Sequence, residues 1–312
     1  MRSLKNRPDT SFGPRLTRRD CLRYLISGSG LLLTMPLSLT GAAEVASGPS
    51  ILEKYLGEEL RYQVGYWLIG HVGDAKAGFL RTDVSDIYRL SLEGRGTGFI
   101  NFLMGGIAYA YTSFCQYVSD QNRLRPVYFE LKKQRGTNLS FRSVSYNYKA
   151  EKIIFLKTNY TGESRTIEAP MRANRIYEDY LTLFYNFRHG SYGSLQKDRQ
   201  YSLPLYTKNQ MNPVKLQIAD LEAEKKYRGQ EFNKTAKDFF IRFQINPEDV
   251  SSGSGEILGW LSSDAVPVKG TIQDVVFFGD LWGELKQRKI VTNSRPVQVP
   301  DSFKKMINTM LE

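Results

Sequence analysis

The sequence has very few residues that could form a disulfide or bind a metal, with two cysteines and two histidines in 312 residues. Cys21 lies in an amino-terminal segment expected to be removed, which leaves Cys115 without an intramolecular partner. His71 and His189 are far apart, and neither has a spaced partner that would complete a metal site. We therefore expect a fold that relies on its core, with Cys115 as a small packed side chain.

Catalytic signatures are also missing. No Gly-x-Ser-x-Gly segment occurs, and no repeat of fixed period is present. The glycine-rich stretch 94–98 lacks the spacing and the strand-to-helix context of a phosphate-binding loop. These absences predict no cofactor, no metal and no catalytic residue, and they favour a protein that is not an enzyme.

The charge has one sign but no dense block. Of the formal net charge of +11, residues 1–43 carry +5, from seven basic and two acidic residues. The remaining +6 is spread along the chain, so nucleic acid is not an expected partner. Attraction to anionic lipid or to other polyanions is compatible with this mildly basic surface.

Residues 1–43 have the pattern of a secretory signal peptide. Arg18 and Arg19 precede the apolar run 25–39, and Gly41-Ala42-Ala43 supplies small residues for cleavage. Paired arginines resemble the bacterial twin-arginine signal, although Cys21 stands where an aromatic residue is usual. The run is shorter than the roughly 20 residues of a membrane span. We expect export to the periplasm by the twin-arginine machinery, with no transmembrane span in the mature chain; an uncleaved anchor is the alternative.

The rest of the chain favours β-structure, with 19 Tyr and 17 Phe and with apolar residues alternating along Leu60, Tyr62, Val64 and Tyr66. Short polar connections predict antiparallel pairing. The expected strands are 60–68, 74–81, 88–95, 108–118, 124–135, 137–147, 152–160, 200–206, 212–227, 237–245, 256–262, 266–278 and 281–288. Residues 161–173 are expected to be a polar connector.

One long helix is predicted, at residues 174–189, because Ile176, Tyr180 and Leu183 recur at helical spacing. Asn174 is its expected cap, Glu178 and Asp179 lie in its early turns, Arg188 and His189 lie in its last turn, and Gly190 can end it. The predicted fold is mainly β: a large curved antiparallel sheet, a half-barrel or open barrel, with this helix packed on its concave face. A two-layer sandwich of the same strands is the alternative.

Four segments are expected in order along the chain. A signal peptide at 1–43 is followed by a linker at 44–56, a single β-rich domain at 57–290 and a tail at 291–312. Phe303, Met306 and Met310 predict a short amphipathic helix in the tail, docked on the body.

Three blocks carry a family resemblance. They are Gly-Glu-Glu-Leu-Arg-Tyr at 57–62, the segment 179–188 followed by Tyr-Ser-Leu-Pro at 201–204, and the segment 259–269 that leads to Phe278-Gly279. Together they resemble the exported bacterial family called domain of unknown function 3108, over about residues 55–287. The resemblance implies an envelope protein of antiparallel β type with no agreed activity. Ala265 and Val266 depart from it, because family members often carry polar or Arg/Ile residues there.

The candidate ligand-binding residues lie in three places. Arg188 and His189 end the predicted helix, and Asp264 lies at a turn between two late strands. Arg188 can pair with Asp264 or with Glu58, either as a buried structural ion pair or as a ligand anchor at the mouth of a cavity. The other candidates are Trp260, as an aromatic platform, and an apolar segment bounded by glycines with Phe99, Phe102 and Met104.

Three hypotheses of function follow. The first is a non-enzymatic periplasmic protein that binds a hydrophobic or amphipathic ligand such as a lipid, or an envelope partner. The second is a cofactor-free hydrolase or lyase that uses Asp264, Arg188 and a tyrosine. The third is a structural envelope protein that offers a sheet edge to a partner chain.

Overall fold

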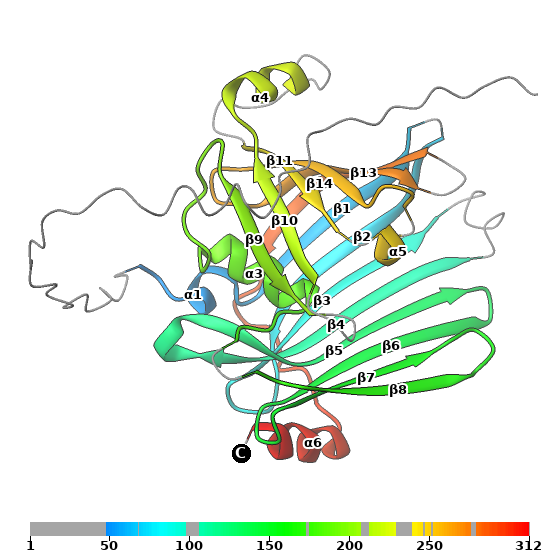
Figure 1. The fold of residues 1–312 in the computed structure, drawn as a ribbon, viewed down its shortest axis with the longest axis vertical. Helices are drawn as coiled ribbons and strands as arrows, with labels where there is room; N and C mark the ends of the chain where they lie inside the picture. Colours follow the sequence, from blue (N-terminus) through cyan, green and yellow to red (C-terminus); the bar gives the residue numbers. More distant parts are fainter. Residues whose placement is uncertain are drawn as a thin grey trace, which may run out of the picture. The chain divides into compact units, whose positions relative to one another are not determined.

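The computed structural model describes residues 48–67, 69–97, 106–172, 175–206, 212–228, 239–245, 247–250, 252–275 and 279–311. Its strands form one antiparallel sheet of 14 strands in the order β8-β7-β6-β5-β4-β3-β2-β1-β14-β13-β12-β11-β10-β9 (Figure 1). The strands are β1 Glu58–Tyr66, β2 Gly70–Arg81, β3 Ile87–Gly96, β4 Ile107–Val118, β5 Arg123–Arg135, β6 Asn138–Asn147, β7 Lys152–Thr158, β8 Ser164–Pro170, β9 Gln200–Leu205, β10 Asn212–Ile218, β11 Phe239–Gln244, β12 Glu256–Leu261, β13 Pro267–Val275 and β14 Gly279–Ile290. The prediction of a mainly β, antiparallel sheet is confirmed.

Strand β1 joins the two halves of the sheet. It pairs with β2 on one side and with β14, more than two hundred residues later, on the other. On one face, Ala77 lies opposite Leu60 across β2, and Leu285 lies opposite Tyr62 across β14. The apolar residues that alternate along β1 are therefore matched by apolar residues on the neighbouring strands, and together they form one apolar face that packs in the core.

The sheet curls strongly and stays open. Tyr206, at the end of edge strand β9, packs on Phe155 of β7 with ring centroids 5.3 Å apart. Its carbonyl oxygen also accepts a hydrogen bond of 2.6 Å from the hydroxyl of Tyr146 in β6. In a flat sheet β7 and β9 would lie roughly 55 Å apart at the usual strand spacing. The contact therefore requires the sheet to roll around its core.

Helix α3, Tyr180–His189, occupies the concave face, as predicted. It contacts β3, β4, β5 and β9, and its side chains belong to the hydrophobic clusters on both sides (Figure 1). Leu183 and Phe187 pack with the β9–β10 side, whereas Leu181 and Tyr185 pack with the β2–β5 side. One short helix thus holds strands from both halves of the sheet against one core.

The helix starts later than the periodicity predicts. Asp179, which is the cap, has extended backbone and accepts hydrogen bonds from the N–H groups of Leu181 and Thr182 at 2.7 and 2.9 Å. Glu178 forms a parallel bridge with Leu205 of β9, and the Ile176 side chain is 43% exposed. Residues 175–179 are not helical, since β9 offers Glu178 a backbone partner and Asp179 is extended as the cap. The predicted cap at Asn174 lies outside the described residues. Gly190 ends the helix in a left-handed conformation, as predicted.

Two other predictions were wrong about element type. The expected connector 161–173 contains the edge strand β8, whose mostly exposed residues pair in register with β7. The expected long strand 212–227 ends at Ile218, and Leu221–Arg228 form helix α4. Strand β3 extends one residue beyond the predicted strand at each end, from Ile87 to Gly96.

The described residues also form helices α1, α5 and α6. Helix α1, Ile51–Tyr55, packs beside α3, and α5, Pro247–Val250, precedes β12. Helix α6, Asp301–Leu311, packs Phe303, Ile307 and Met310 on β3–β5, at the range where the sequence predicts an amphipathic helix. A 3₁₀ turn, Ser119–Gln121, joins β4 to β5. No helix among the described residues has the length and apolarity to cross a membrane.

Candidate functional site: a concave apolar cavity beside an ion-pair network

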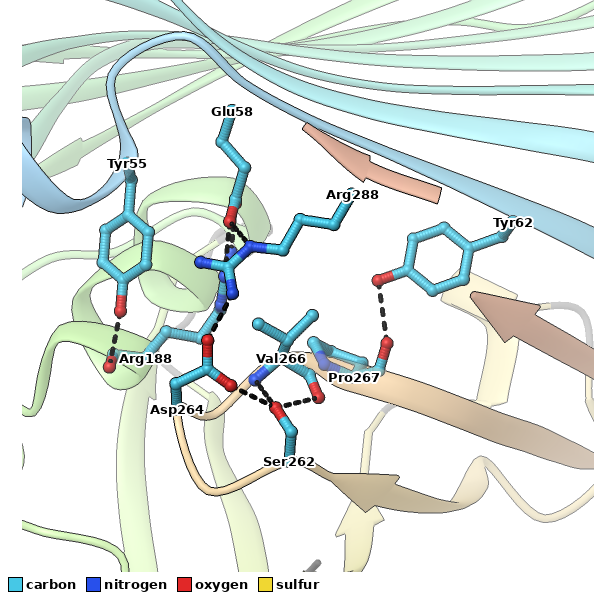
Figure 2. Close-up of polar contacts among 9 residues, drawn as sticks. All are labelled: Tyr55, Glu58, Tyr62, Arg188, Ser262, Asp264, Val266, Pro267 and Arg288. Carbon is cyan, nitrogen blue, oxygen red and sulfur yellow. Dashed lines mark hydrogen bonds and ion pairs between the residues drawn. The ribbon is translucent and has the colours of Figure 1, made fainter. Parts of the chain in front are cut away.

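The carboxyl end of α3 is held by a buried ion-pair network (Figure 2). Arg188 donates two hydrogen bonds to the Glu58 carboxylate, at 2.6 and 2.8 Å, and both side chains are almost completely buried. The Tyr55 hydroxyl donates to the Arg188 carbonyl oxygen at 2.8 Å. The guanidinium also lies 4.5 Å from the Tyr55 ring centroid and 4.9 Å from that of Phe184. Of the two acids predicted as partners of Arg188, Glu58 and Asp264, it is Glu58 that pairs with it.

Asp264 belongs to the same network through a second arginine. Arg288 of β14 donates to Glu58 at 2.9 Å and also pairs with Asp264 (Figure 2). The Asp264 carboxylate accepts a further hydrogen bond of 2.5 Å from Ser262. Partial burial works to raise the pKa of Asp264, but the bonds from Ser262 and Arg288 lower it overall. Asp264 is therefore a stable anion, which suits an ion pair and opposes a role as a general acid.

The opposite end of α3 holds a second polar cluster that the sequence did not reveal. Glu178 accepts hydrogen bonds from Tyr192 at 2.6 Å and from Asn186 at 2.8 Å, and it pairs with Arg123. Asp179 accepts a bond of 2.6 Å from Ser113. Burial raises the pKa of both acids, to about 7 for Asp179 despite the bonds from Ser113 and the helix N–H groups. The two acids of this cluster are completely buried and only Tyr192 is partly exposed, so the cluster positions the helix.

His189 and Trp260 are placed differently from Arg188. His189 is half-buried, and burial together with the charge of Lys54 lowers its pKa, so the neutral imidazole is favoured. Trp260 is 1% exposed and packs on Phe240 with ring centroids 5.0 Å apart. Its neighbour Leu261 belongs to the core around α3, so Trp260 points to the opposite face of the sheet. The structure does not bring Trp260 together with the Arg188 network.

The remaining candidates, Phe99, Phe102 and Met104, lie outside the described residues. Ligand binding by Arg188, His189 and Asp264 stays a prediction, because nothing in the geometry tests it directly. Their charges are already paired, with Arg188 on Glu58 and Asp264 on Arg288. A ligand at this end of α3 would have to compete with these bonds.

A cavity of about 330 Å³ lies further along the concave face. Its floor comes from six neighbouring strands, β4-β3-β2-β1-β14-β13, and Val250 of α5 also lines it. The apolar and aromatic lining residues are Val64, Tyr66, Val72, Ala75, Leu92, Ile107, Tyr109, Tyr111, Val250, Ile272, Val275 and Leu281. Asp74 and Arg95 are its charged lining residues. An apolar lining with few polar groups is typical of a site for a hydrophobic or amphipathic ligand.

Small residues on β2 and β3 leave room for the cavity where α3 does not reach. Ala75 of β2 lies opposite Gly94 of β3, and Gly94 lies opposite Tyr109 of β4. A Cβ atom built on Gly94 would meet nothing within 4 Å. Nearer the Glu58 end of the strands, the same face is filled instead by Leu60, Ala77 and Phe184 of α3. The helix thus fills one part of the concave face, and glycine leaves the next part hollow.

Tyr62 lies between the network and the cavity. It follows Leu60 and precedes Val64 on the same face of β1, and its hydroxyl donates to the Pro267 carbonyl oxygen at 3.1 Å (Figure 2). Burial raises its pKa, so the phenol stays neutral. Sequence reasoning had placed a cavity at the Arg188 end; the described cavity starts one step beyond Tyr62. A local signal for the cavity is the glycine at position 94, inside the strand pattern of β3.

Neither metal nor thiol chemistry is supported by the described side chains. Within the described ranges, no three His, Cys, Asp or Glu residues cluster so that they could hold a metal ion. Cys115 is fully buried, and burial raises its pKa well above the usual value, which suppresses the reactive thiolate.

The fold and the cavity define a class of protein, an open β-barrel-like sheet wrapped around one helix with a hollow beside it. The particular family follows from the sequence. Residues 61–285 match the model of the family described as protein of unknown function DUF3108, and the chain belongs to this family. No curated protein matches the chain.

Two solved structures are similar in outline. One is a β-barrel-like protein of domain of unknown function DUF1849 from Brucella abortus, with 9% identity and a TM-score of 0.42, covering 76% of this chain and 98% of that one. The other is a putative exported protein with a YmcC-like fold from Bacteroides fragilis NCTC 9343, with 6% identity and a TM-score of 0.22, covering 75% of this chain and 95% of that one. Neither likeness bears on activity.

Proposed function

We propose that this protein is an exported, non-enzymatic envelope protein that binds a hydrophobic or amphipathic ligand in the concave cavity. The observation that carries the proposal is the apolar hollow between six strands, kept open by Gly94. Its volume of about 330 Å³ lies at the lower end of the range of ligand pockets. A single aliphatic chain or one compact ring system fits this size better than a whole diacyl lipid.

The two charged lining residues, Asp74 and Arg95, border the cavity through strands whose other residues face it. Arg95 is exposed, and it lies between Gly94 and Gly96, which also line the cavity. Asp74 lies opposite Arg95 on β2 and bonds to His71 at 3.2 Å. Along their strands Asp74 and Arg95 alternate with Ala75 and Gly94, so their side chains point to the opposite face of the sheet. The hollow itself therefore offers a ligand the apolar surface of residues such as Val64 and Leu92, which suits the hydrophobic part of that ligand.

The hydrolase alternative has less support. Its carboxylate, Asp264, has a lowered pKa and is paired with Arg288, and its cation, Arg188, is paired with Glu58. Neither residue lines the cavity. Location in the periplasm, and export by the twin-arginine machinery, remain part of the proposal and rest on the sequence of residues 1–43.

A cavity-filling substitution tests the proposal. The environment-sensitive probe N-phenyl-1-naphthylamine should bind the purified protein with increased fluorescence. Gly94→Val should weaken this binding at least tenfold, because the added side chain enters the hollow without meeting the existing structure. Val also suits a strand, so the fold should be retained.

The matched control is Ser91→Val. Ser91 lies in the same strand on the opposite face, one step from Leu92, so the same side chain is introduced outside the cavity. It should leave probe binding unchanged. Equal binding by the wild type and Gly94→Val, or no probe binding by the wild type, would contradict the proposal. Circular dichroism of both variants checks that the sheet is intact.

A further inference from the structure

The face of the sheet opposite α3 carries a second hollow of a different chemical kind. It has a volume of about 500 Å³ and lies over β12, β13 and β14. Trp282 of β14 lines it, whereas the neighbouring Leu281 lines the concave cavity. The two hollows are therefore on opposite faces of the same strands and cannot share a ligand.

Two indole side chains are the prominent features of this convex groove. Trp282 lies opposite Gly65 of β1, and a Cβ atom on Gly65 would fall 2.2 Å from Cζ2 of the indole. The Trp282 ring thus rests directly on the backbone of β1, which only glycine permits, and its other side is turned to the groove. Trp67 is 82% exposed, and its backbone N–H donates a hydrogen bond to the Asp280 carbonyl oxygen at 3.3 Å. It is therefore a diagonal neighbour of Trp282 on the same face.

Polar side chains surround these rings. Thr271 and Gln273 of β13 supply a hydroxyl and an amide, and Asp280 and Glu284 of β14 supply carboxylates. Lys269 adds one ammonium group. At one end, Trp260 closes the groove beneath Ala223 of α4. The concave cavity, by comparison, is lined almost entirely by apolar groups.

We infer that this convex groove binds an oligosaccharide. A pyranose ring has a flat face of C–H groups and an edge of hydroxyls, so it needs an aromatic surface flanked by both donors and acceptors. Trp67 and Trp282 supply two such surfaces, and Thr271, Gln273 and the carboxylates supply the polar partners. Glu284 is paired with Lys286, so with Asp280 and Lys269 the groove has no excess of positive charge that would attract a polyanion, and a neutral or N-acetylated sugar is the expected class.

Titration with defined sugars tests this inference. The full protein is titrated with chitotetraose, cellohexaose and maltohexaose, and heat and tryptophan fluorescence are recorded. At least one sugar should bind with a Kd of about 1 mM or tighter and should shield Trp67 from iodide quenching. Trp67→Ala should weaken binding at least tenfold without unfolding the protein, because this side chain is 82% exposed. Trp282→Phe should weaken it as well.

Two matched variants make the test specific. Leu139→Ala removes another exposed apolar side chain away from the groove and should bind the sugar like the wild type. Gly94→Val changes only the concave cavity, so it should lose the apolar probe and keep the sugar. The inference is overturned if no sugar gives a signal up to about 10 mM, if Trp67→Ala binds normally, or if Gly94→Val loses the sugar too. Each of these outcomes is separate from the result with the apolar probe.

Discussion

At the scale of single residues, Glu58 decides how the network at the carboxyl end of α3 is built. Its side chain is buried and accepts hydrogen bonds from Arg188 and Arg288 together. Sequence reasoning recognised Arg188 as a charged residue on an apolar helix and gave two possible acids, Asp264 and Glu58. Sequence alone does not show which of the two acids pairs with Arg188, because this depends on the pairing of β1 with β14, which brings the start of β1 next to the end of β14.

Removing the charge of Glu58 should destabilise the fold strongly. Glu58→Gln leaves the buried Arg188 guanidinium without its anion, and a loss of about 3–5 kcal/mol in unfolding free energy is expected. Urea denaturation measures it. The control is Glu59→Gln, the next residue of β1 on the opposite face. Glu59 pairs with Arg61, Lys76 and Lys289, which are about half exposed, so a smaller cost of about 1–2 kcal/mol is expected. Equal losses of unfolding free energy for the two variants would show that the buried Glu58–Arg188 pair stabilises the fold no more than the ion pairs of Glu59.

At the scale of elements, α3 is a helix whose start is set by its surroundings. Periodicity extends the helix back to Asn174, but Glu178 is held in a bridge with β9, and Asp179 takes the cap position with Ser113 of β4 as its partner. The carboxyl end, with Gly190, was predicted correctly because a left-handed glycine is a local signal. The amino end was not, because its partners come from strands distant in sequence.

The buried cap should make stability depend on pH. Burial raises the folded-state pKa of Asp179 to about 7, above an unfolded value of about 3.9. Between these values the folded protein binds more protons than the unfolded chain, so stability falls as the pH rises through this window. Asp179→Asn keeps an oxygen for the helix N–H groups and cannot ionise. The wild type should therefore lose up to about 1.4 kcal/mol per pH unit more than the variant.

Urea denaturation across roughly pH 4 to 8 measures this difference in slope. Glu178, whose pKa burial also raises, is present in both proteins and leaves a shared slope. Asp83→Asn is the control. There the bond from Lys304 lowers the pKa of an exposed carboxyl, so this substitution should not flatten the curve in the same window. Parallel curves for the wild type and Asp179→Asn would mean that Asp179 is not the titrating group.

At the scale of the whole molecule, the sheet surrounds α3 and presents two unlike hollows on its two faces. Burial of the apolar face explains the curl, since Tyr206 at one edge reaches Phe155 and Tyr146 near the other. The same curl creates the concave cavity, because α3 is too short to fill the whole inner face. The proposed ligand and the inferred sugar would thus bind one sheet from opposite sides.

Export belongs to this scale as well. Arg18→Lys combined with Arg19→Lys should block transport, because the twin-arginine pathway reads the paired guanidinium groups. Fractionation of cells that express the protein should then show it retained in the cytoplasm. Arg2→Lys with Arg7→Lys makes the same chemical change outside the pair and should leave export intact. Normal crossing of the paired variant would remove the twin-arginine assignment.

The sequence by itself determined the β class, most of the strands, the carboxyl end of α3 and the family. These follow from local information: the period-two alternation, the turn residues and the short motifs. It misread β8, a mostly exposed edge strand that is decided by its pairing with β7. It also misread α4, although Leu221–Arg228 is rich in strong helix formers, because the apolar alternation of β10 was extended too far. Tertiary structure alone decided the partner of Arg188 and the position of the cavity. Gly94, Val64 and Leu281 are far apart in sequence, and only the pairing of β3, β2, β1 and β14 brings them to one hollow.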